Sequence, residues 1–304
     1  MAIQGLALAA FILAAKATTW VSAASLVTFI FGDSLTDVGN NNYLQYSLAR
    51  SDYPWYGVDY AGGKATGRFT NGRTIGDIIC NTATTAKLEI PPPPPYLSLS
   101  KNDDALLTGV NYASGGAGIL NDTGLYFIQR LSFDDQIDCF KKTKESITTK
   151  IGEDAANKLC NEAMFFIGIG SNDYINNYLQ PFLADGQQYT PEEFGELLIS
   201  TLDKQLTRLY QLGARMVAFH GLGPLGCIPS QRVKSKTRLC LKRVNEWVLE
   251  FNSGVKNLIA TLNHRFPNAK FTFADTYGDV LDLIENPTAY GKFNHLLINN
   301  PTDA

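Results

Sequence analysis

Five short apolar stretches recur along this chain, and a loop of small or polar residues follows each of them. All five are rich in β-branched or aromatic side chains, and they cover residues 26–31, 109–113, 163–169, 215–220 and 270–274. They are apolar at successive positions instead of alternating, which is typical of parallel strands covered on both faces. The pattern therefore predicts a sheet of about five parallel strands.

Helical patterns lie between these stretches. Thr190 and Glu193 form a capping box around Pro191, which suits the first position of a helix. The apolar residues that follow keep to one face until Gly213, where that helix should end. A second long helix is predicted over residues 241–262. Strand, loop and helix in alternation predict an α/β fold, a doubly wound, flavodoxin-like sheet with helices on both faces.

The composition excludes several classes of protein. The chain has 304 residues, of which 45% are hydrophobic and 18% charged, which fits a folded domain and not a disordered chain. Its formal net charge is −3, and no basic cluster is denser than Lys141 with Lys142 or residues 234–238. Nucleic acid is therefore not an expected partner, because phosphate binding needs a concentrated positive surface.

The N-terminal segment differs from the rest of the chain. Residues 6–15 form an unbroken apolar run, and the small residues Val-Ser-Ala-Ala follow at 21–24. This order is typical of a secretory signal peptide. A membrane anchor is the alternative, but a bilayer needs about 20 apolar residues and no stretch approaches that length. We therefore predict a signal peptide over residues 1–24, a single domain over residues 25–304, and a secreted, extracellular protein without a stable membrane span.

The cysteines agree with secretion, which permits disulfide bonds. Cys80, Cys139, Cys160, Cys227 and Cys240 make an odd number, so at least one thiol stays unpaired. No Cys-x-x-Cys pair occurs, and the spacing matches no zinc site. Cys227 and Cys240 bracket a short polar segment and are the predicted disulfide pair.

Ser34 follows the first apolar stretch immediately and is the first candidate for chemistry. A serine in this place is commonly a helix cap. A phosphate-binding loop is a second alternative, because N–H groups at a helix start bind anions. Asp33 and Asp37 would repel such an anion. The third alternative is a catalytic nucleophile, and the rest of the sequence bears on it.

Four sequence blocks accompany Ser34. They are GDSL with DVGNNN within residues 32–42, TGRFTNGRT at 66–74, GVNYASGGAG at 109–118 and FIGIGSNDY at 166–174. In this order they closely resemble the plant-type GDSL lipases of the SGNH hydrolase superfamily, and the resemblance extends over residues 26–291. It implies an SGNH-type sheet and a serine esterase or lipase that hydrolyses acyl or acetyl esters of small molecules, lipids or polymers. It implies no metal and no cofactor, and it sets no oligomeric state.

The resemblance also implies roles for particular residues. Ser34 is the expected nucleophile, and its backbone N–H is one donor to the oxyanion of the tetrahedral intermediate. The backbone N–H of Gly116 and the side-chain amide of Asn172 are the expected further donors. Gly116 is preferred to its neighbour Gly115 because it stands where related enzymes place their donor. Glycine lets a substrate approach the backbone closely, and asparagine offers an N–H without charge. The alternative for Asn172 is an ordinary turn residue.

The family carries its general base in a final Asp-x-x-His block, which we do not find in this sequence. None of His220, His264 and His295 has an aspartate three residues before it. The sequence therefore predicts a domain that is incomplete at its C-terminus and an impaired esterase, with an inactive form that at most binds ligand as the alternative. His220 ends the fourth apolar stretch at the edge where ligands bind, so it is the candidate substitute base, against a structural histidine as the alternative.

Overall fold

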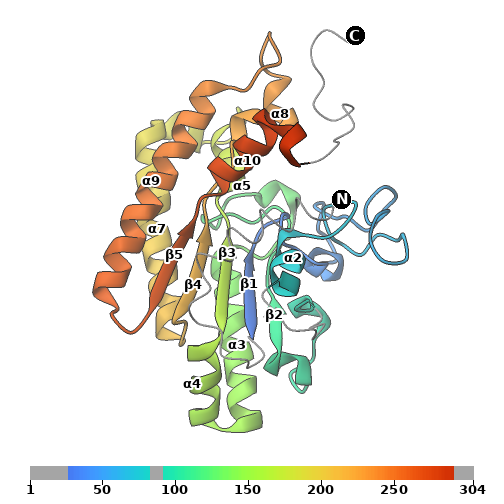
Figure 1. Cartoon of the computed structure of the whole chain (residues 1–304), viewed down its shortest axis with the longest axis vertical. Coiled ribbons are helices and arrows are strands. Elements are labelled where there is room, and N and C mark those ends of the chain that lie inside the picture. Colours follow the sequence, from blue (N-terminus) through green and yellow to red (C-terminus); the bar gives the residue numbers. More distant parts are fainter. Residues whose placement is uncertain (1–26, 83–91, 291–304) are drawn as a thin grey trace.

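A five-stranded parallel sheet forms the centre of the molecule (Figure 1). The structure, a computed structural model, describes residues 27–82 and 92–290. The strand order is β2-β1-β3-β4-β5. The strands are β1 (Thr28–Gly32), β2 (Gly109–Asn111), β3 (Met164–Gly168), β4 (Met216–His220) and β5 (Lys270–Ala274). Each overlaps its predicted stretch, of which residue 26 lies outside the described residues, so the predicted parallel sheet is confirmed.

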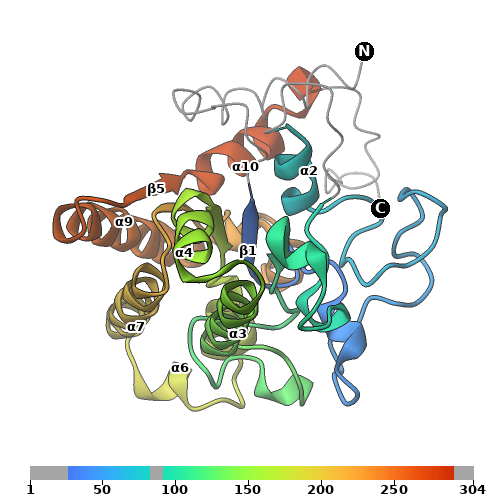
Figure 2. The same cartoon turned by 90° about the horizontal axis from the view of Figure 1, so that it is seen from below.

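Helices cover both faces of this sheet, as predicted. Seen from below, α3, α7 and α9 lie on one side, and α2 and α10 lie on the other (Figure 2). The helices are α2 (Ile75–Thr82), α3 (Phe133–Ile151), α4 (Glu153–Glu162), α5 (Ser171–Asp173), α6 (Asp185–Gln188), α7 (Pro191–Gln211), α8 (Pro229–Arg232), α9 (Lys242–Arg265) and α10 (Thr276–Glu285). Short 3₁₀ turns cover Asn40–Tyr43, Tyr96–Ser98, Asp104–Leu107, Leu125–Phe127, Leu225–Cys227 and Pro287–Tyr290, and one π-helical turn covers Tyr174–Tyr178.

The start of α7 follows its sequence closely. The Thr190 hydroxyl accepts a hydrogen bond from the Glu193 N–H at 3.2 Å, and the Glu193 carboxylate accepts one from the Thr190 N–H at 2.8 Å. Pro191 occupies the first turn, where a missing N–H costs nothing. After the helix, Gly213 has a φ of 111°, a conformation that favours glycine. The predicted boundaries of this helix are confirmed.

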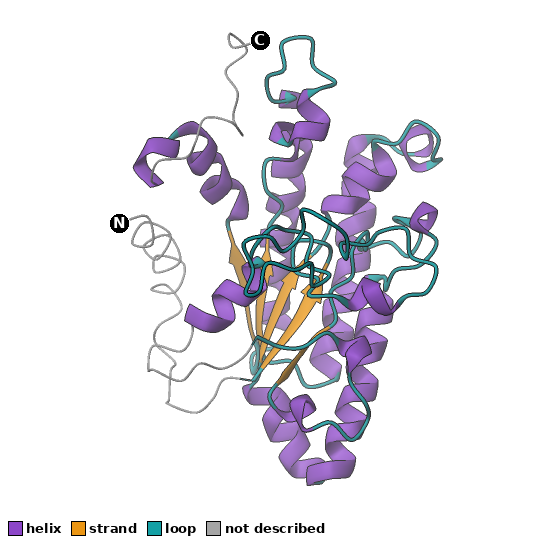
Figure 3. Ribbon diagram, turned by 90° about the vertical axis from the view of Figure 1, so that its right-hand side faces the viewer, coloured by secondary structure: helices purple, strands orange, loops and turns teal. Residues whose placement is uncertain are grey.

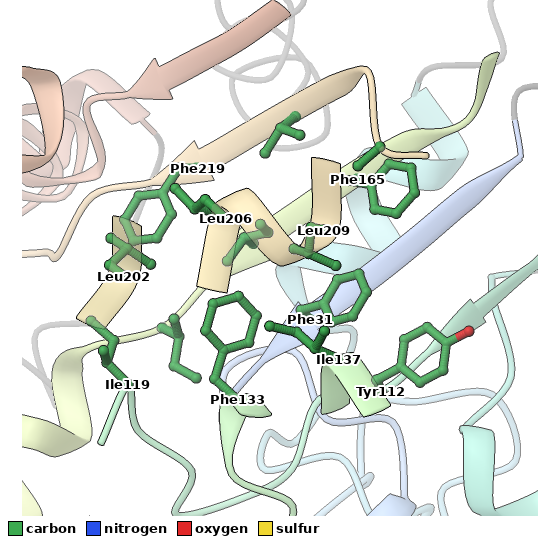
Figure 4. Close-up of a cluster of buried hydrophobic side chains, with 14 of the residues drawn as sticks. Phe31, Tyr112, Ile119, Phe133, Ile137, Phe165, Leu202, Leu206, Leu209 and Phe219 are labelled. Carbon is green, nitrogen blue, oxygen red and sulfur yellow. The ribbon is translucent and has the colours of Figure 1, made fainter. Parts of the chain in front are cut away.

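The main core lies between the sheet and the layer of α3, α7 and α9 (Figure 4). Phe31, Phe165 and Phe219 project into it from three neighbouring strands, and each is fully buried. The helices supply Phe133, Ile137, Leu202, Leu206 and Leu209. Burial of these apolar side chains is the dominant favourable term in holding the helices against the sheet.

The opposite face of the sheet is covered less completely. Its buried cluster consists of Ile30 and Phe166, with Ile79 of α2 packed against them. On β5, Phe271 is buried, whereas the side chains before and after it, Lys270 and Thr272, are exposed. The prediction that all five stretches are covered on both faces is therefore wrong for β5. The described residues cover that strand on the α9 face, and its other face carries polar side chains.

Two predictions bear on secretion. The predicted signal peptide, residues 1–24, lies outside the described residues. The predicted disulfide between Cys227 and Cys240 is present. Within residues 27–82 and 92–290, no helix is long and apolar enough to cross a bilayer.

The core packing predicts the effect of shortening one side chain of α7. Leu206→Ala should lower the free energy of unfolding by about 2–5 kcal/mol, because a fully buried leucine leaves a cavity that its neighbours fill poorly. Leu249→Ala is the control, since Leu249 on α9 is 47% exposed and its loss should change stability by less than about 0.5 kcal/mol. Urea titration measures both, and equal losses would contradict this account of the core.

Candidate active site

The loops that follow β1, β2 and β3 meet at one edge of the sheet. Figure 3 shows the loops gathered beyond the arrowheads of the strands. Ser34 follows β1, Gly116 follows β2 and Asn172 follows β3, and these three strands are neighbours in the sheet. The Asn172 side-chain amide donates a hydrogen bond to the Ala117 carbonyl at 2.8 Å, which joins the second loop to the third. The three predicted site residues therefore lie on adjacent loops at the edge where such sheets bind ligands.

The turn that carries Ser34 is held in place by a side chain of α3. The Gln136 side chain accepts a hydrogen bond from the Gly32 N–H at 2.9 Å and donates one to the Gly32 carbonyl at 2.8 Å. Asp33 and Thr36 are buried, whereas Ser34 between them is half-exposed. Among the described residues, none forms a hydrogen bond with the Ser34 hydroxyl. The serine is thus presented to solvent from a fixed backbone.

The neighbouring glycines of the second loop differ in what their N–H groups bond to. The Gly115 N–H donates to the Asp37 carboxylate at 3.0 Å. No acceptor for the Gly116 N–H occurs in the described part of the chain. Gly116 has a φ of 84°, and a Cβ there would lie 2.6 Å from the Phe127 ring, so this position requires glycine. Of the pair, Gly116 is the residue whose N–H remains free for a ligand.

Buried side chains from the first loop fasten the second one. Asn40 donates to the carbonyls of Asn111 and Ala113, both at 2.9 Å. Asn41 donates to the Gly115 carbonyl at 2.9 Å. These amides replace the backbone partners that a loop lacks. The DVGNNN run belongs to a family block, but the sequence alone predicts no role for its asparagines.

The third loop is fastened to the second by Asp173. Its carboxylate accepts hydrogen bonds from the N–H groups of Ile119 at 2.8 Å and Leu120 at 2.9 Å, and from the Thr123 hydroxyl at 2.8 Å. Asp173 is completely buried. Its neighbour Asn172 is 8% exposed, and the anchored backbone holds its amide against the loop that contains Gly116.

Three buried carboxyl groups surround the site, and burial disfavours their charged forms. Burial, together with the negative charges of Asp173 and Asp37, raises the pKa of Asp33 to about 7, although hydrogen bonds from the Leu35 N–H and from its own N–H oppose the shift. Burial also raises the pKa of Asp37 and of Asp173, each to about 6, although several N–H donors oppose the shift. Asp33, directly before Ser34, is therefore substantially protonated near neutral pH.

The two histidines within the described residues differ in their position relative to this site and in their burial. His220 lines a cavity together with Asp33, Thr36 and Phe166, and its ring centroid lies 4.0 Å from that of Phe166. Burial lowers the pKa of His220 to about 4, so the ring is neutral at pH 7 and is a weak base. His264 is exposed in the last turn of α9, and His295 lies outside the described residues.

No metal site is formed by the residues that the structure describes. Within residues 27–82 and 92–290, no group of three or more His, Cys, Asp or Glu side chains is arranged to hold a metal ion. The buried carboxylates near Ser34 instead accept hydrogen bonds from N–H groups, as Asp37 does from Gly39 and Asn40 at 2.8 Å each.

The raised pKa of Asp33 predicts how stability depends on pH. Its pKa rises from 3.8 to about 7 on folding, so the stabilisation is complete below about 3.8 and is lost as the pH rises through about 7. The unfolding midpoint in urea should therefore fall between pH 5 and pH 7.5. In Asp33→Asn, which keeps an acceptor for the Leu35 N–H, it should fall less. Exposed Asp154→Asn is the control, and an unchanged slope in Asp33→Asn would contradict the assignment.

Comparison with known proteins places this arrangement in a family. A family model described as GDSL-like Lipase/Acylhydrolase matches residues 28–295. GDSL esterase/lipase At5g37690 of Arabidopsis thaliana is 72% identical over 291 residues, which cover 96% of this chain and 80% of that protein. GDSL esterase/lipase At1g74460 of the same plant is 45% identical over 270 residues, which cover 88% of this chain and 72% of that protein. The chain therefore belongs to the GDSL-like lipase/acylhydrolase family and is, by that membership, a carboxylic ester hydrolase.

Proposed function

We propose that this enzyme hydrolyses esters through an acyl-enzyme on Ser34, with Gly116 and Asn172 completing the oxyanion hole. The observation that carries the proposal is the meeting of a half-exposed serine, a free Gly116 N–H and an anchored Asn172 amide on three adjacent loops. Each of these groups has the chemistry that acyl transfer requires. The alternative roles, a helix cap for Ser34 and a turn residue for Asn172, would each explain one residue. They would not explain why all three groups lie on adjacent loops.

The reaction begins when the Ser34 hydroxyl oxygen attacks the ester carbonyl carbon and the carbonyl oxygen becomes an oxyanion. The N–H groups of Ser34 and Gly116 and the amide of Asn172 donate hydrogen bonds to that oxygen. Each such donor contributes about 2.7–4 kcal/mol of transition-state stabilisation. Collapse of the intermediate breaks the ester C–O bond and expels the alcohol, whose oxygen takes up the proton that the serine lost. Water then attacks the acyl-enzyme by the same route, which releases the carboxylic acid and regenerates the Ser34 hydroxyl.

A serine hydroxyl attacks well when a base accepts its proton. The pKa of His220, about 4, makes that side chain a poor acceptor at neutral pH. We therefore assign His220 a structural role against Phe166 and assign no base among residues 27–82 and 92–290. We propose that the family's Asp-x-x-His block, which residues 1–304 do not contain, supplies the base in an efficient enzyme.

The proposed substrates are acyl or acetyl esters of small molecules, lipids or polymers, and nucleic acid is not among them. We propose that residues 1–24 are a signal peptide and residues 25–304 one SGNH hydrolase domain, so that the enzyme acts outside the cell. The disulfide between Cys227 and Cys240 supports an oxidising compartment. No metal or cofactor is proposed, because the proposed steps need serine, N–H donors and a base.

The role of Ser34 and the need for a base are tested together. A chain of the printed residues should hydrolyse p-nitrophenyl acetate no faster than its Ser34→Ala variant, since loss of the base costs about 10⁶ in turnover in a comparable serine hydrolase. Joining a C-terminal segment that carries the Asp-x-x-His block expected of the family should raise turnover by several orders of magnitude, and Ser34→Ala should abolish that gain. Rapid turnover by the printed residues, lost in His220→Gln, would instead identify His220 as the base.

The role of Asn172 is tested in the extended chain of that experiment. Asn172→Ala should lower kcat by about 10²–10³ and leave KM nearly unchanged, because the oxyanion forms after substrate binds. Circular dichroism and the unfolding midpoint report whether the fold is retained. Equal kcat per folded molecule with a lower midpoint would show that Asn172 is a turn residue.

A further inference from the structure

Asn176 lies four residues after Asn172, on a turn of unusual geometry. The short helix α5 continues directly into the π-helical turn Tyr174–Tyr178. Such turns are rare and frequently occur at functional sites. The turn places the half-buried side chain of Asn176 beside Asn172.

The two side chains are joined by a short hydrogen bond. Asn176 Nδ2 donates to Asn172 Oδ1 at 2.6 Å. On the other side, Asn172 Nδ2 donates to the Ala117 carbonyl at 2.8 Å. The Asn172 amide therefore has its oxygen and its nitrogen each bound to a different partner. The second N–H of Asn172 has no acceptor among the described residues.

These two hydrogen bonds select one of the two orientations of the Asn172 amide, which packing alone does not distinguish. The two orientations of an asparagine amide have nearly the same shape, and they differ in whether the nitrogen or the oxygen faces a given point. The backbone anchor at Asp173 fixes where Asn172 lies, and it does not select between the two. A flipped amide would set its oxygen against the Ala117 carbonyl and its N–H groups against the Asn176 donor. It would also direct an oxygen toward the forming oxyanion.

We propose that Asn176 is a positioning residue, which holds the Asn172 amide in the orientation that leaves an N–H free for the oxyanion. The inference rests on the proposed function, because it requires Asn172 to act as an oxyanion donor. Asn176 acts through Asn172 and does not itself touch the substrate. The next residue has a different task, since Asn177 Nδ2 donates to Asp185 at 2.8 Å and to Thr123 at 3.3 Å and so holds the turn.

The first test compares kinetics on p-nitrophenyl acetate in the full chain. An oxyanion hole and substrate binding together leave a rate about 10³–10⁴ above that in water when a triad member is missing, so a loss of oxyanion stabilisation is measurable without a strong base. Asn176→Leu removes the donor at similar size and should lower kcat about tenfold, with KM within about twofold, since one hydrogen bond is lost. Asn176→Asp, which accepts where asparagine donates, should lower kcat further. Exposed Asn257→Leu on α9 is the matched control.

A double-mutant cycle separates this inference from the function on which it rests. In an Asn172→Ala background, Asn176→Leu should have no further effect, because the group that it orients is gone. If Asn172→Ala lowers kcat and Asn176→Leu does not, or if the two losses multiply, the positioning role is overturned and the oxyanion role stands. If Asn172→Ala itself has no effect, the oxyanion role fails, and the inference with it.

A spectroscopic measurement decides the question independently of turnover. The side-chain NH₂ signals of Asn172 in a ¹H–¹⁵N spectrum are identified by their disappearance in Asn172→Ala. In Asn176→Leu these signals should shift and exchange faster with solvent, because the amide then occupies both orientations. In Asn257→Leu they should stay in place. Unchanged Asn172 signals in Asn176→Leu would overturn the proposal.

Discussion

The contact on which the rest of the site depends is the buried carboxylate of Asp37. It binds the N–H groups of Gly39 and Asn40 within its own loop, and it reaches across to the N–H of Gly115 on the next loop. The Asp37 carboxylate joins the loops after β1 and β2 by hydrogen bonds. Strand pairing and apolar packing would not hold these two loops together. By occupying the Gly115 N–H, the carboxylate also determines which glycine of the pair can face a ligand. The Asp37 carboxylate thus holds the loop structure and also leaves free the N–H that we propose as an oxyanion donor.

Burying polar groups in this way costs free energy of folding unless nearly every group has a hydrogen-bond partner. The carboxylate of Asp173 accepts hydrogen bonds from the N–H groups of two other residues and from the Thr123 hydroxyl, whereas that of Asp33 accepts one from another residue, through the Leu35 N–H. The pKa values follow the same order: Asp33, with fewer such partners, has a pKa of about 7, and Asp173 has a pKa of about 6. The site is therefore assembled as a network, in which the loss of one member leaves others unsatisfied.

Much of the fold follows from local patterns in the sequence. The central strands are apolar at nearly every position, and the capping box at Thr190 fixes the start of α7, so both could be predicted. The resemblance to GDSL lipases supplied Ser34, Gly116 and Asn172 as candidates, although nothing in the residues themselves distinguished Gly116 from its neighbour. That distinction depends on a hydrogen bond between residues 78 positions apart. The bond from Asn176 depends on a π-helical turn, for which the sequence has no local pattern.

The two hydrogen bonds between Gln136 and Gly32 link Ser34, the proposed nucleophile, to a distant part of the chain. Both backbone groups of Gly32 are bonded to a side chain 104 residues away, on the first turns of α3. The turn that carries Ser34 can therefore not open by itself while α3 remains docked. In native-state fluctuations the two segments should open as one cooperative unit, with a free energy close to that of global unfolding. The rigidity of the backbone at Ser34 therefore depends on the docking of α3 against the sheet.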